Sequence, residues 1–246
     1  MIDDNRFNVL VTNLLNEIEK TQNEVIKEAG KVISEAIENG GVLHAFSTGH
    51  SHMVVEEMFY RAGGLMPVNP ILDPALMLHE GAFKSTKIER LSGYASVIFE
   101  SVKFQKGEPI LIISNSGINP VPVEMALLSK QNGQRVIAIT SVTLSRSLQS
   151  RHDSGKKLMD IADYVIDNCI KDGDASIEIE EYGQRVGAVS SIVGIYIAQK
   201  LVISVVNEFL KKGKKPPIFM SANVPGGDEH NAYYINKYSE RIRGLY

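Results

Sequence analysis

The sequence predicts an α/β fold: a single doubly wound, five-stranded parallel sheet in flavodoxin-like order, flanked by helices and preceded by an N-terminal helical segment. Apolar segments without polar alternation, such as 109–113 and 135–140, are typical of strands covered on both faces. Segments with helical spacing of apolar residues alternate with them, which indicates βαβ units. The 246 residues, 43% of them hydrophobic, suffice for one sizeable core.

The first half of the chain supplies the N-terminal helical segment and the first two strands. Gly40-Gly41 ends a long run of apolar residues at helical spacing, and an apolar strand begins directly afterwards. Pro67 and Pro70 limit the next strand to a sheet edge. The expected elements are helix 6–38, strand 42–47, a helix from the turn 48–51 to about residue 62, edge strand 65–72 and helix 88–104.

The second half completes the sheet and ends in a long helix and a tail. The long helix is apolar nearly all round, so we expect it to be buried on more than one side or to form a subunit interface. Polar residues within it, such as Lys200 and Glu208, argue against a membrane span. The expected elements are strand 109–113, helix 122–130, strand 135–140, strand 164–170, helix 188–212 and the tail 216–246.

Composition argues against several classes of partner. The formal charge of −3 gives no global attraction to nucleic acid or to an anionic membrane. Residues 1–40 hold eight acidic and four basic side chains, and a segment with a net charge of −4 is a poor DNA reader. The N-terminal sequence lacks the pattern of a secretory signal, and the single cysteine, Cys169, excludes an intramolecular disulfide. We therefore expect a cytoplasmic protein.

Polar residues follow the first and third strands of the predicted sheet at the point where each strand ends. In a flavodoxin-like order these two strands are neighbours where the strand order reverses, so their loops meet at one edge. Hydroxyls, amides and a glycine at the start of a helix offer several donors to one anion. Such residues are also common turn formers and N-caps, which is the alternative interpretation of each. The residues concerned are Ser51, Ser114, Asn115, Ser116 and Asn119.

The two loops favour a phosphate monoester over a nucleotide. No GxGxxG follows the first strand, and no GxxxxGK[ST] occurs in the sequence. We expect no cofactor. His50 and His52 raise the question of a metal, but no third ligand lies at a recognisable spacing, and we expect no metal site.

From about residue 33 to residue 231 the sequence resembles the sugar isomerase (SIS) domain proteins. The segment 114–119 is similar to the S-x-S-G-x-T phosphate loop of that family, with Asn119 in place of threonine. Gly49-His50-Ser51 is similar to the G-x-S of the first loop. The resemblance implies a five-stranded parallel sheet that binds phosphosugars. It is strongest to bacterial SIS-domain proteins for which it implies a ligand class rather than a reaction.

A looser similarity links the chain to the arabinose 5-phosphate isomerases of that family. In that branch a glutamate lies eight residues before a turn that opens the last long helix, and the same spacing here reaches Glu180. His79-Glu80-Gly81 resembles an H-G-D segment of that branch. The chain departs from it at Glu57, where the branch has a basic residue, and at Ala188-Val189, where it has Pro-Thr. The exact activity is therefore not carried over.

The resemblance yields candidate catalytic residues. Glu180 is the candidate base for proton transfer between C1 and C2 through a cis-enediol, although a solvated charge in an acidic run is the alternative. His79 is the candidate acid for ring opening, and His230 competes with it because a flexible tail can reach a neighbouring subunit. Ser190 and Ser191 open the long helix and are candidate phosphate ligands, although N-capping would explain one of them.

The sequence is compatible with two functions. The first is a phosphosugar isomerase, or a related lyase acting on an amino-sugar phosphate. The second is a non-catalytic phosphosugar sensor that acts through a protein partner rather than on DNA. The expected organisation is an N-terminal helical segment (1–41) packing on the domain or its dimer partner, a phosphosugar-binding SIS domain (42–215) and a tail (216–246) completing the site or interface. We expect a homodimer or a higher homo-oligomer, built through the N-terminal helix and the long helix.

Overall fold

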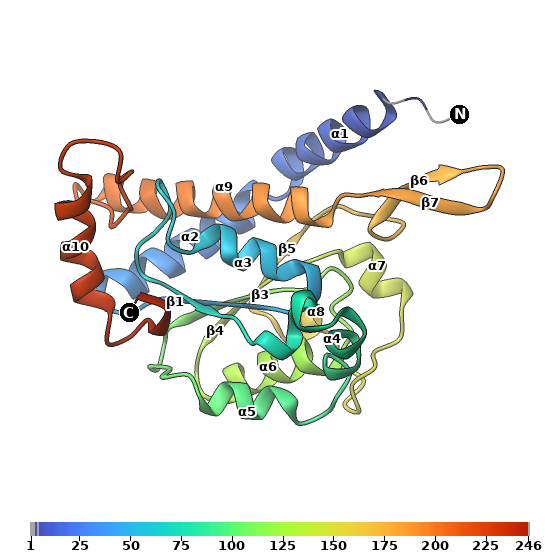
Figure 1. Ribbon diagram of the computed structural model, residues 1–246, viewed down its shortest axis with the longest axis horizontal. Helices are drawn as coiled ribbons and strands as arrows, with labels where there is room; N and C mark the ends of the chain where they lie inside the picture. Colours follow the sequence, from blue (N-terminus) through green and yellow to red (C-terminus); the bar gives the residue numbers. More distant parts are fainter. Residues whose placement is uncertain (1–2, 4, 246) are drawn as a thin grey trace.

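The computed structural model describes residues 3 and 5–245 and has an α/β architecture (Figure 1). Its strands are β1 (Leu43–Ser47), β2 (Val68–Ile71), β3 (Pro109–Ile113), β4 (Arg135–Thr140), β5 (Tyr164–Asp167), β6 (Ala175–Ile179) and β7 (Gln184–Ala188). Its helices are α1 (Asn5–Thr21), α2 (Asn23–Glu38), α3 (His52–Met58), α4 (Ala82–Ile88), α5 (Tyr94–Glu100), α6 (Pro120–Gln131), α7 (Val142–Ser147), α8 (Leu158–Ile161), α9 (Ser190–Lys211) and α10 (Gly227–Tyr238). Short 3-10 helices lie at η1 (Gly49–Ser51), η2 (Pro74–Leu76), η3 (Leu78–Glu80) and η4 (Arg243–Leu245).

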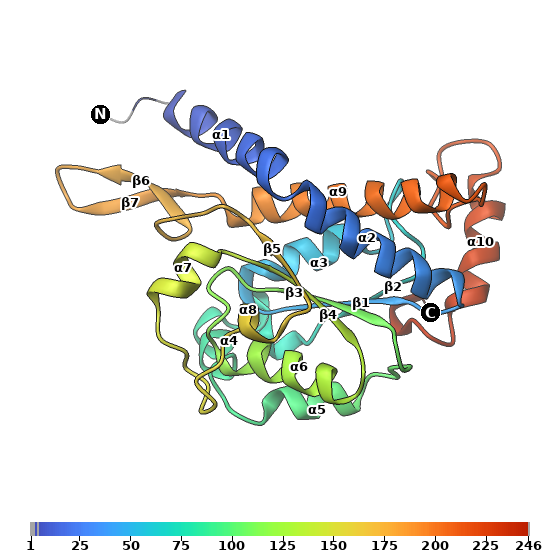
Figure 2. The same cartoon turned by 180° about the vertical axis from the view of Figure 1, so that it is seen from behind.

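The predicted sheet is confirmed. β1 to β5 pair in parallel in the order β2-β1-β3-β4-β5, which is the flavodoxin-like order, and β2 is an edge strand as Pro67 and Pro70 indicate. β3 shows why its sequence lacks polar alternation. Leu111 and Ile113 pack into the core beneath α2, α3 and α9, whereas Ile110 and Ile112 pack into the core beneath α5, α6 and α8. Figures 1 and 2 show these helices on opposite faces of the sheet.

The N-terminal helical segment consists of two helices rather than the one predicted over 6–38. The break falls at Gln22, whose side-chain Oε1 accepts a hydrogen bond of 2.9 Å from the backbone N–H of Asp167 at the end of β5. After this break, α2 contributes Ile26, Ile33 and Ile37 to the same core as the sheet. This tertiary contact lies far away in the sequence, so helical periodicity did not reveal it.

The β6–β7 hairpin and α10 were not predicted, and neither were the short helices α7 and α8. β6 and β7 form an antiparallel hairpin between β5 and α9, and together with α1 the hairpin projects from the body of the molecule (Figures 1 and 2). It packs on α1 at Gly187, where an added Cβ would approach the Phe7 ring to 3.1 Å. α10 forms within the tail. The helix predicted over 88–104 was wrong in its extent, because Gly93, at φ +83, separates α4 from α5.

α9 lies against α1, α2 and α3, as the prediction of burial on more than one side requires. Its crossing with α2 is close, because a side chain at Gly30 would overlap Ser204. Within the described residues it is the one helix long and apolar enough to cross a membrane. Half of that apolar stretch is buried inside the molecule. Its apolar character therefore has a structural explanation in the core.

Candidate functional site

The carboxyl ends of β1 and β3 lie side by side, because Ser47 pairs with Ile113 in the sheet register. The loops that follow them meet at a cleft of about 290 Å³, as expected at the point where the strand order reverses. The cleft is lined by Thr48, Gly49, His50, Ser51, Leu78, Ser85, Thr86, Glu89, Ser114, Asn115, Ser116, Asp174 and Ser190. Residues from the two predicted loops therefore share it with residues from α4 and from the start of α9.

The loop after β3 is held in shape by its own hydrogen bonds. Ser114 Oγ accepts a bond of 3.2 Å from Gly117 N, and the carbonyl of Asn115 accepts one of 2.9 Å from Ser141 N. Gly117 adopts φ +63, and a Cβ there would lie 3.0 Å from Thr140 Oγ1. Glycine is therefore required both by the backbone conformation and by the lack of space.

Three hydroxyls of the cleft, those of Ser51, Ser116 and Ser190, have no hydrogen bond to any described residue. Ser51 and Ser116 are both half-buried and line the cleft from the two different loops. Ser190 contributes from the N-terminus of α9, where the N–H groups of Val189 and Ser190 donate to Asp174 Oδ1 at 3.0 and 2.7 Å. A carboxylate thus occupies the end of a 22-residue helix, where negative charge is stabilised.

The acidic side chains that line the cleft are Glu89 and Asp174, and the ring of His50 lines it as well. No lysine or arginine is among its lining residues in the part of the chain that the structure describes. An anion in this cleft would therefore be held by hydroxyls and backbone N–H groups. His52 follows the lining residue Ser51 in the sequence and is buried. Burial lowers the pKa of this histidine, and its Nδ1 is paired with the carbonyl of Gly49 at 3.0 Å.

Glu89 is held in the cleft by hydrogen bonds to its side chain and its backbone. Its Oε1 accepts hydrogen bonds from Thr48 Oγ1 at 2.8 Å and from Asn119 Nδ2 at 2.7 Å. Its backbone is fixed as well, since Glu89 N donates to Ser85 O at 2.9 Å and Glu89 O accepts from Val121 N at 3.2 Å. A carboxylate so positioned beside two hydroxyl-bearing loops is suited to proton transfer.

The structure brings Ser51, Ser114, Asn115, Ser116 and Ser190 together in the cleft. Asn119 is buried next to it, but its amide donates to Glu89 and its carbonyl accepts from Arg151 rather than facing the lining. Ser191 is half-buried and does not line the cleft.

The predicted catalytic residues lie outside the cleft within one chain. Glu180 is exposed in the turn of the β6–β7 hairpin. His79 is exposed in η3, next to the lining residue Leu78. His230 lies in α10, at the end of the molecule away from α4 and α7 (Figure 1), and its Nε2 pairs with Ile218 O at 2.9 Å. Glu180 and His230 would therefore act only at the cleft of another copy.

Sequence reasoning missed Glu89 and Asp174 as cleft residues, and it considered His50 only as a metal ligand. Glu89 fell inside a predicted helix and Asp174 inside a predicted connection, so neither stood beside a strand end. The polar segment Ser85-Thr86 upstream of Glu89 was the one local signal available. Within residues 3 and 5–245, no group of three or more His, Cys, Asp or Glu side chains could hold a metal ion.

Comparison with known proteins gives three kinds of similarity. Residues 6–141 match the sequence profile of the SIS domain. UPF0309 protein lin2794 of Listeria innocua is 40% identical over 238 residues, which cover 97% of this chain and 96% of that protein. UPF0309 protein TTE0306 of Caldanaerobacter subterraneus subsp. tengcongensis is 44% identical over 234 residues, which cover 94% of this chain and 95% of that protein.

Solved structures share the fold at low sequence identity. A phosphoheptose isomerase from Francisella tularensis superposes with a TM-score of 0.55 at 16% identity, over 84% of this chain and 100% of its own. Phosphoheptose isomerase GmhA from Neisseria gonorrhoeae superposes with a TM-score of 0.54 at 13% identity, over 81% of this chain and 94% of its own. The likeness concerns the fold.

Proposed function

Because this chain belongs to the SIS domain family, we propose that its cleft binds a phosphorylated sugar or amino sugar and isomerises it between aldose and ketose forms. The observation that carries the proposal is the meeting of the two serine-bearing loops with the Glu89 carboxylate in one cleft at the strand-order switch. Relatives of the fold named phosphoheptose isomerases support the same ligand class.

Phosphate binding follows from the donors of the cleft. The hydroxyls of Ser51 and Ser116 line the cleft from the two loops, and in the turn at 114–117 the backbone N–H groups of Asn115 and Ser116 donate to no described residue and are available to an anion. Glu89 and Asp174 repel a phosphate that sits near them. We therefore place the phosphate at the two loops and the sugar hydroxyls toward the carboxylates.

The isomerisation needs one base that carries a proton between C2 and C1. The carboxylate takes the C2 proton, the C–H electron pair forms the C1=C2 bond, and the C1=O π pair moves to O1, which takes up a proton to give the cis-enediol. The C2 hydroxyl then gives up its proton, which replaces the one taken up by O1, and its electron pair forms the C2 carbonyl while C1 takes back the proton from the carboxylate. We assign this role to Glu89, the carboxylate that the chain itself fixes beside the loops. Glu180 remains the competing assignment, since a second copy could bring its hairpin to this cleft.

Ring opening needs an acid near the ring oxygen. His50 lines the cleft and His79 lies beside its lining residue Leu78, so both are candidates within one chain. His230 becomes a candidate only through a second copy. Single alanine variants tested on cyclic and open-chain phosphosugars separate ring opening from proton transfer, because the acid is dispensable for an open-chain substrate.

The alternative function is a phosphosugar sensor that acts through a protein partner. The observation that favours it is the projecting hairpin, which leaves Tyr182 76% and Val186 46% exposed. Such aromatic and apolar exposure beside the start of α9 is suited to a protein contact. The sensor would bind phosphosugars in the same cleft without exchanging their protons.

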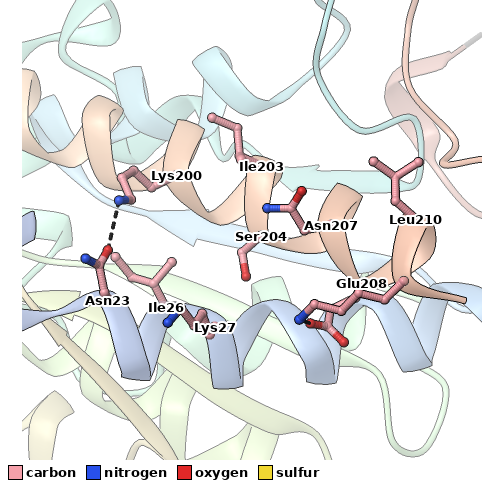
Figure 3. A pocket seen from close by; sticks show the side chains of 10 residues that line it. Asn23, Ile26, Lys27, Lys200, Ile203, Ser204, Asn207, Glu208 and Leu210 are labelled. Atoms are coloured by element: carbon pink, nitrogen blue, oxygen red, sulfur yellow. Dashed lines mark hydrogen bonds and ion pairs between the residues drawn. The ribbon is translucent and has the colours of Figure 1, made fainter.

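We also propose that the chain forms a homo-oligomer through the groove between α2 and α9 (Figure 3). Ile203 and Leu210 of α9 are each 58% exposed at this groove. Lysines (Lys27, Lys200, Lys211) and Glu208 surround these side chains, so a two-fold-related copy would meet both apolar surface and opposite charges. Sedimentation should show a dimer or larger at micromolar concentration, and Ile203→Asp should shift it toward monomer. A monomeric wild-type protein would refute this.

One experiment tests the catalytic proposal against the sensor. Hexose 6-phosphates, pentose 5-phosphates and N-acetylhexosamine 6-phosphates are screened by thermal shift, and the binders are incubated in deuterated water to follow proton exchange at C2. We expect exchange with the wild type, its loss in Glu89→Gln with binding retained, and full exchange in Glu180→Gln. Binding without exchange for every compound would favour the sensor. Loss of exchange in Glu180→Gln alone would move the base to the hairpin.

A further inference from the structure

Asn119 lies between Glu89 and Arg151. Its Nδ2 donates to Glu89 Oε1 at 2.7 Å, and its Oδ1 accepts from Arg151 Nη1 at 2.7 Å. Arginine has only donors and an ionised carboxylate has only acceptors, so the amide has a single orientation that satisfies both. Arg151 therefore determines which way the amide of Asn119 points.

The same pattern determines which oxygen of Glu89 is available. Thr48 and Asn119 both donate to Oε1, and no described residue donates to Oε2. A carboxylate acts as a base through a lone pair of one oxygen that points at the substrate. Hydrogen bonds to the other oxygen fix the orientation of the carboxylate and hence the direction of that lone pair. Oε2 is accordingly the oxygen that can accept a proton from a bound ligand.

The donors reach Glu89 from the two loops that line the phosphate side of the cleft. Thr48 belongs to the loop after β1, and Asn119 ends the loop after β3. Arg151 is tied to that second loop by its backbone as well, since Arg151 N donates to Ile118 O at 2.9 Å. The loops proposed to bind the phosphate are therefore linked to the carboxylate by these hydrogen bonds.

The geometry points to Arg151 and Asn119 as positioning residues that orient Glu89, so that Oε2 is the proton-accepting oxygen. The role of Glu89 as a base rests on the proposed function. The chain of hydrogen bonds from Arg151 through Asn119 to Glu89, called the relay below, is independent of that function. It also gives the asparagine at position 119 a role: a longer amide side chain spans from the phosphate loop to the carboxylate and accepts from an arginine at the same time. Asn119 then serves the base rather than the phosphate.

The relay is tested first without any substrate, by NMR of the full-length ¹⁵N-labelled protein. The side-chain amide signals of Asn119 are identified by their loss in Asn119→Asp, which keeps the shape and the acceptor for Arg151 but removes the donor. We expect these signals to move in Glu89→Gln and in Arg151→Gln. They should stay in place in Arg146→Gln, a matched change at an exposed arginine in α7. Signals unmoved by both relay variants would overturn the inference.

The kinetic arm uses the phosphosugar that exchanges fastest in the panel. Asn119→Ala and Asn119→Asp should lower kcat for C2 exchange by about tenfold or more with KM within about twofold, because a lost hydrogen bond to a charged group has this size. Arg151→Gln should lower kcat less, and it should have no further effect in the Asn119→Ala background. Effects that multiply, or that fall on KM, would refute a positioning role.

The two arms separate the inference from the function on which it rests. In one outcome, the wild type shows no proton exchange at C2 for any compound while the Asn119 signals respond as expected. That result would refute catalysis and leave the relay as a structural feature of a binding site. Exchange that persists while the amide signals ignore Glu89 and Arg151 would refute the relay and leave the proposed function standing. Circular dichroism of each variant shows whether it is folded, so that loss of activity or of a signal can be distinguished from unfolding.

Discussion

Replacing Glu108 with glutamine should remove a large part of the stability of this fold. The carboxylate is 3% exposed and collects hydrogen bonds from four donors at the amino end of β3. His44 Nε2 and Gln105 N contact Oε2 at 2.9 and 2.8 Å, and Val42 N and Arg241 Nη2 contact Oε1 at 3.0 and 2.7 Å. Arg241 comes from the C-terminal tail, so this carboxylate joins the tail to the sheet.

The magnitude follows from the pKa of this carboxyl. Burial alone would raise it, but the hydrogen bonds from His44, Gln105 and Arg241 outweigh burial and lower the pKa of Glu108 from 4.5 to about 2. The difference corresponds to about 3 kcal/mol of folding free energy. Because the folded-state pKa is lowered, this stabilisation is fully present above pH 4.5 and is lost as the pH falls toward 2.

Urea unfolding followed by circular dichroism at pH 7, 5, 4 and 3 measures the effect. Glu108→Gln should lower the free energy of unfolding by about 3 kcal/mol at pH 7 and 5, with the difference from wild type narrowing below pH 4.5. Glu24→Gln, at a surface pair with Lys27 in the first turn of α2, is the matched control and should lower the free energy of unfolding by less than about 1 kcal/mol. A loss under about 1 kcal/mol at pH 7, or a difference that stays constant down to pH 3, would refute this account of the network.

Three further changes have defined outcomes. Gly30→Ala should lower the free energy of unfolding in urea by about 1–3 kcal/mol, because the new Cβ overlaps Ser204, and Ser204→Gly should restore much of it. Gly117→Ala should cost about 1–2 kcal/mol of stability, since φ is +63 and Thr140 Oγ1 lies 3.0 Å from the added Cβ, and titration calorimetry should show weaker binding of inorganic phosphate. Asp174→Ala should destabilise the molecule by about 1 kcal/mol yet strengthen phosphate binding, because it uncovers the N-terminus of α9; unchanged or weaker binding would refute that.

The sheet was predictable because its signal is local. The segment 109–113 carries only apolar side chains after Pro109, and burial on both faces of a parallel sheet demands that composition. The loops were predictable for the same reason. Ser51 and Ser114 lie in the loops that follow β1 and β3, and the flavodoxin-like strand order makes these two strands neighbours. Strand order and loop chemistry thus follow from short stretches of sequence.

The hairpin and the helix break were not predictable in this way. The hairpin has only a weak alternation, with one well-buried residue, Ile177, and it is stabilised by packing on α1 at the far end of the chain. The break at Gln22 depends on a hydrogen bond to Asp167 across 145 positions. Periodicity reports which residues face a core, and it contains no information about which distant segment supplies that core.

The candidate base shows the same limit at the site. Spacing within one segment led to Glu180, whereas our proposed base is Glu89, one of two carboxylates that line the cleft, held by Thr48 from one loop and Asn119 from the other. A phosphate loop can be recognised along the chain because consecutive N–H groups and hydroxyls do the binding. A base is defined by donors that converge on it from separate segments, here 41 and 30 positions away. A candidate base can therefore be recognised only when the sheet has brought those segments together.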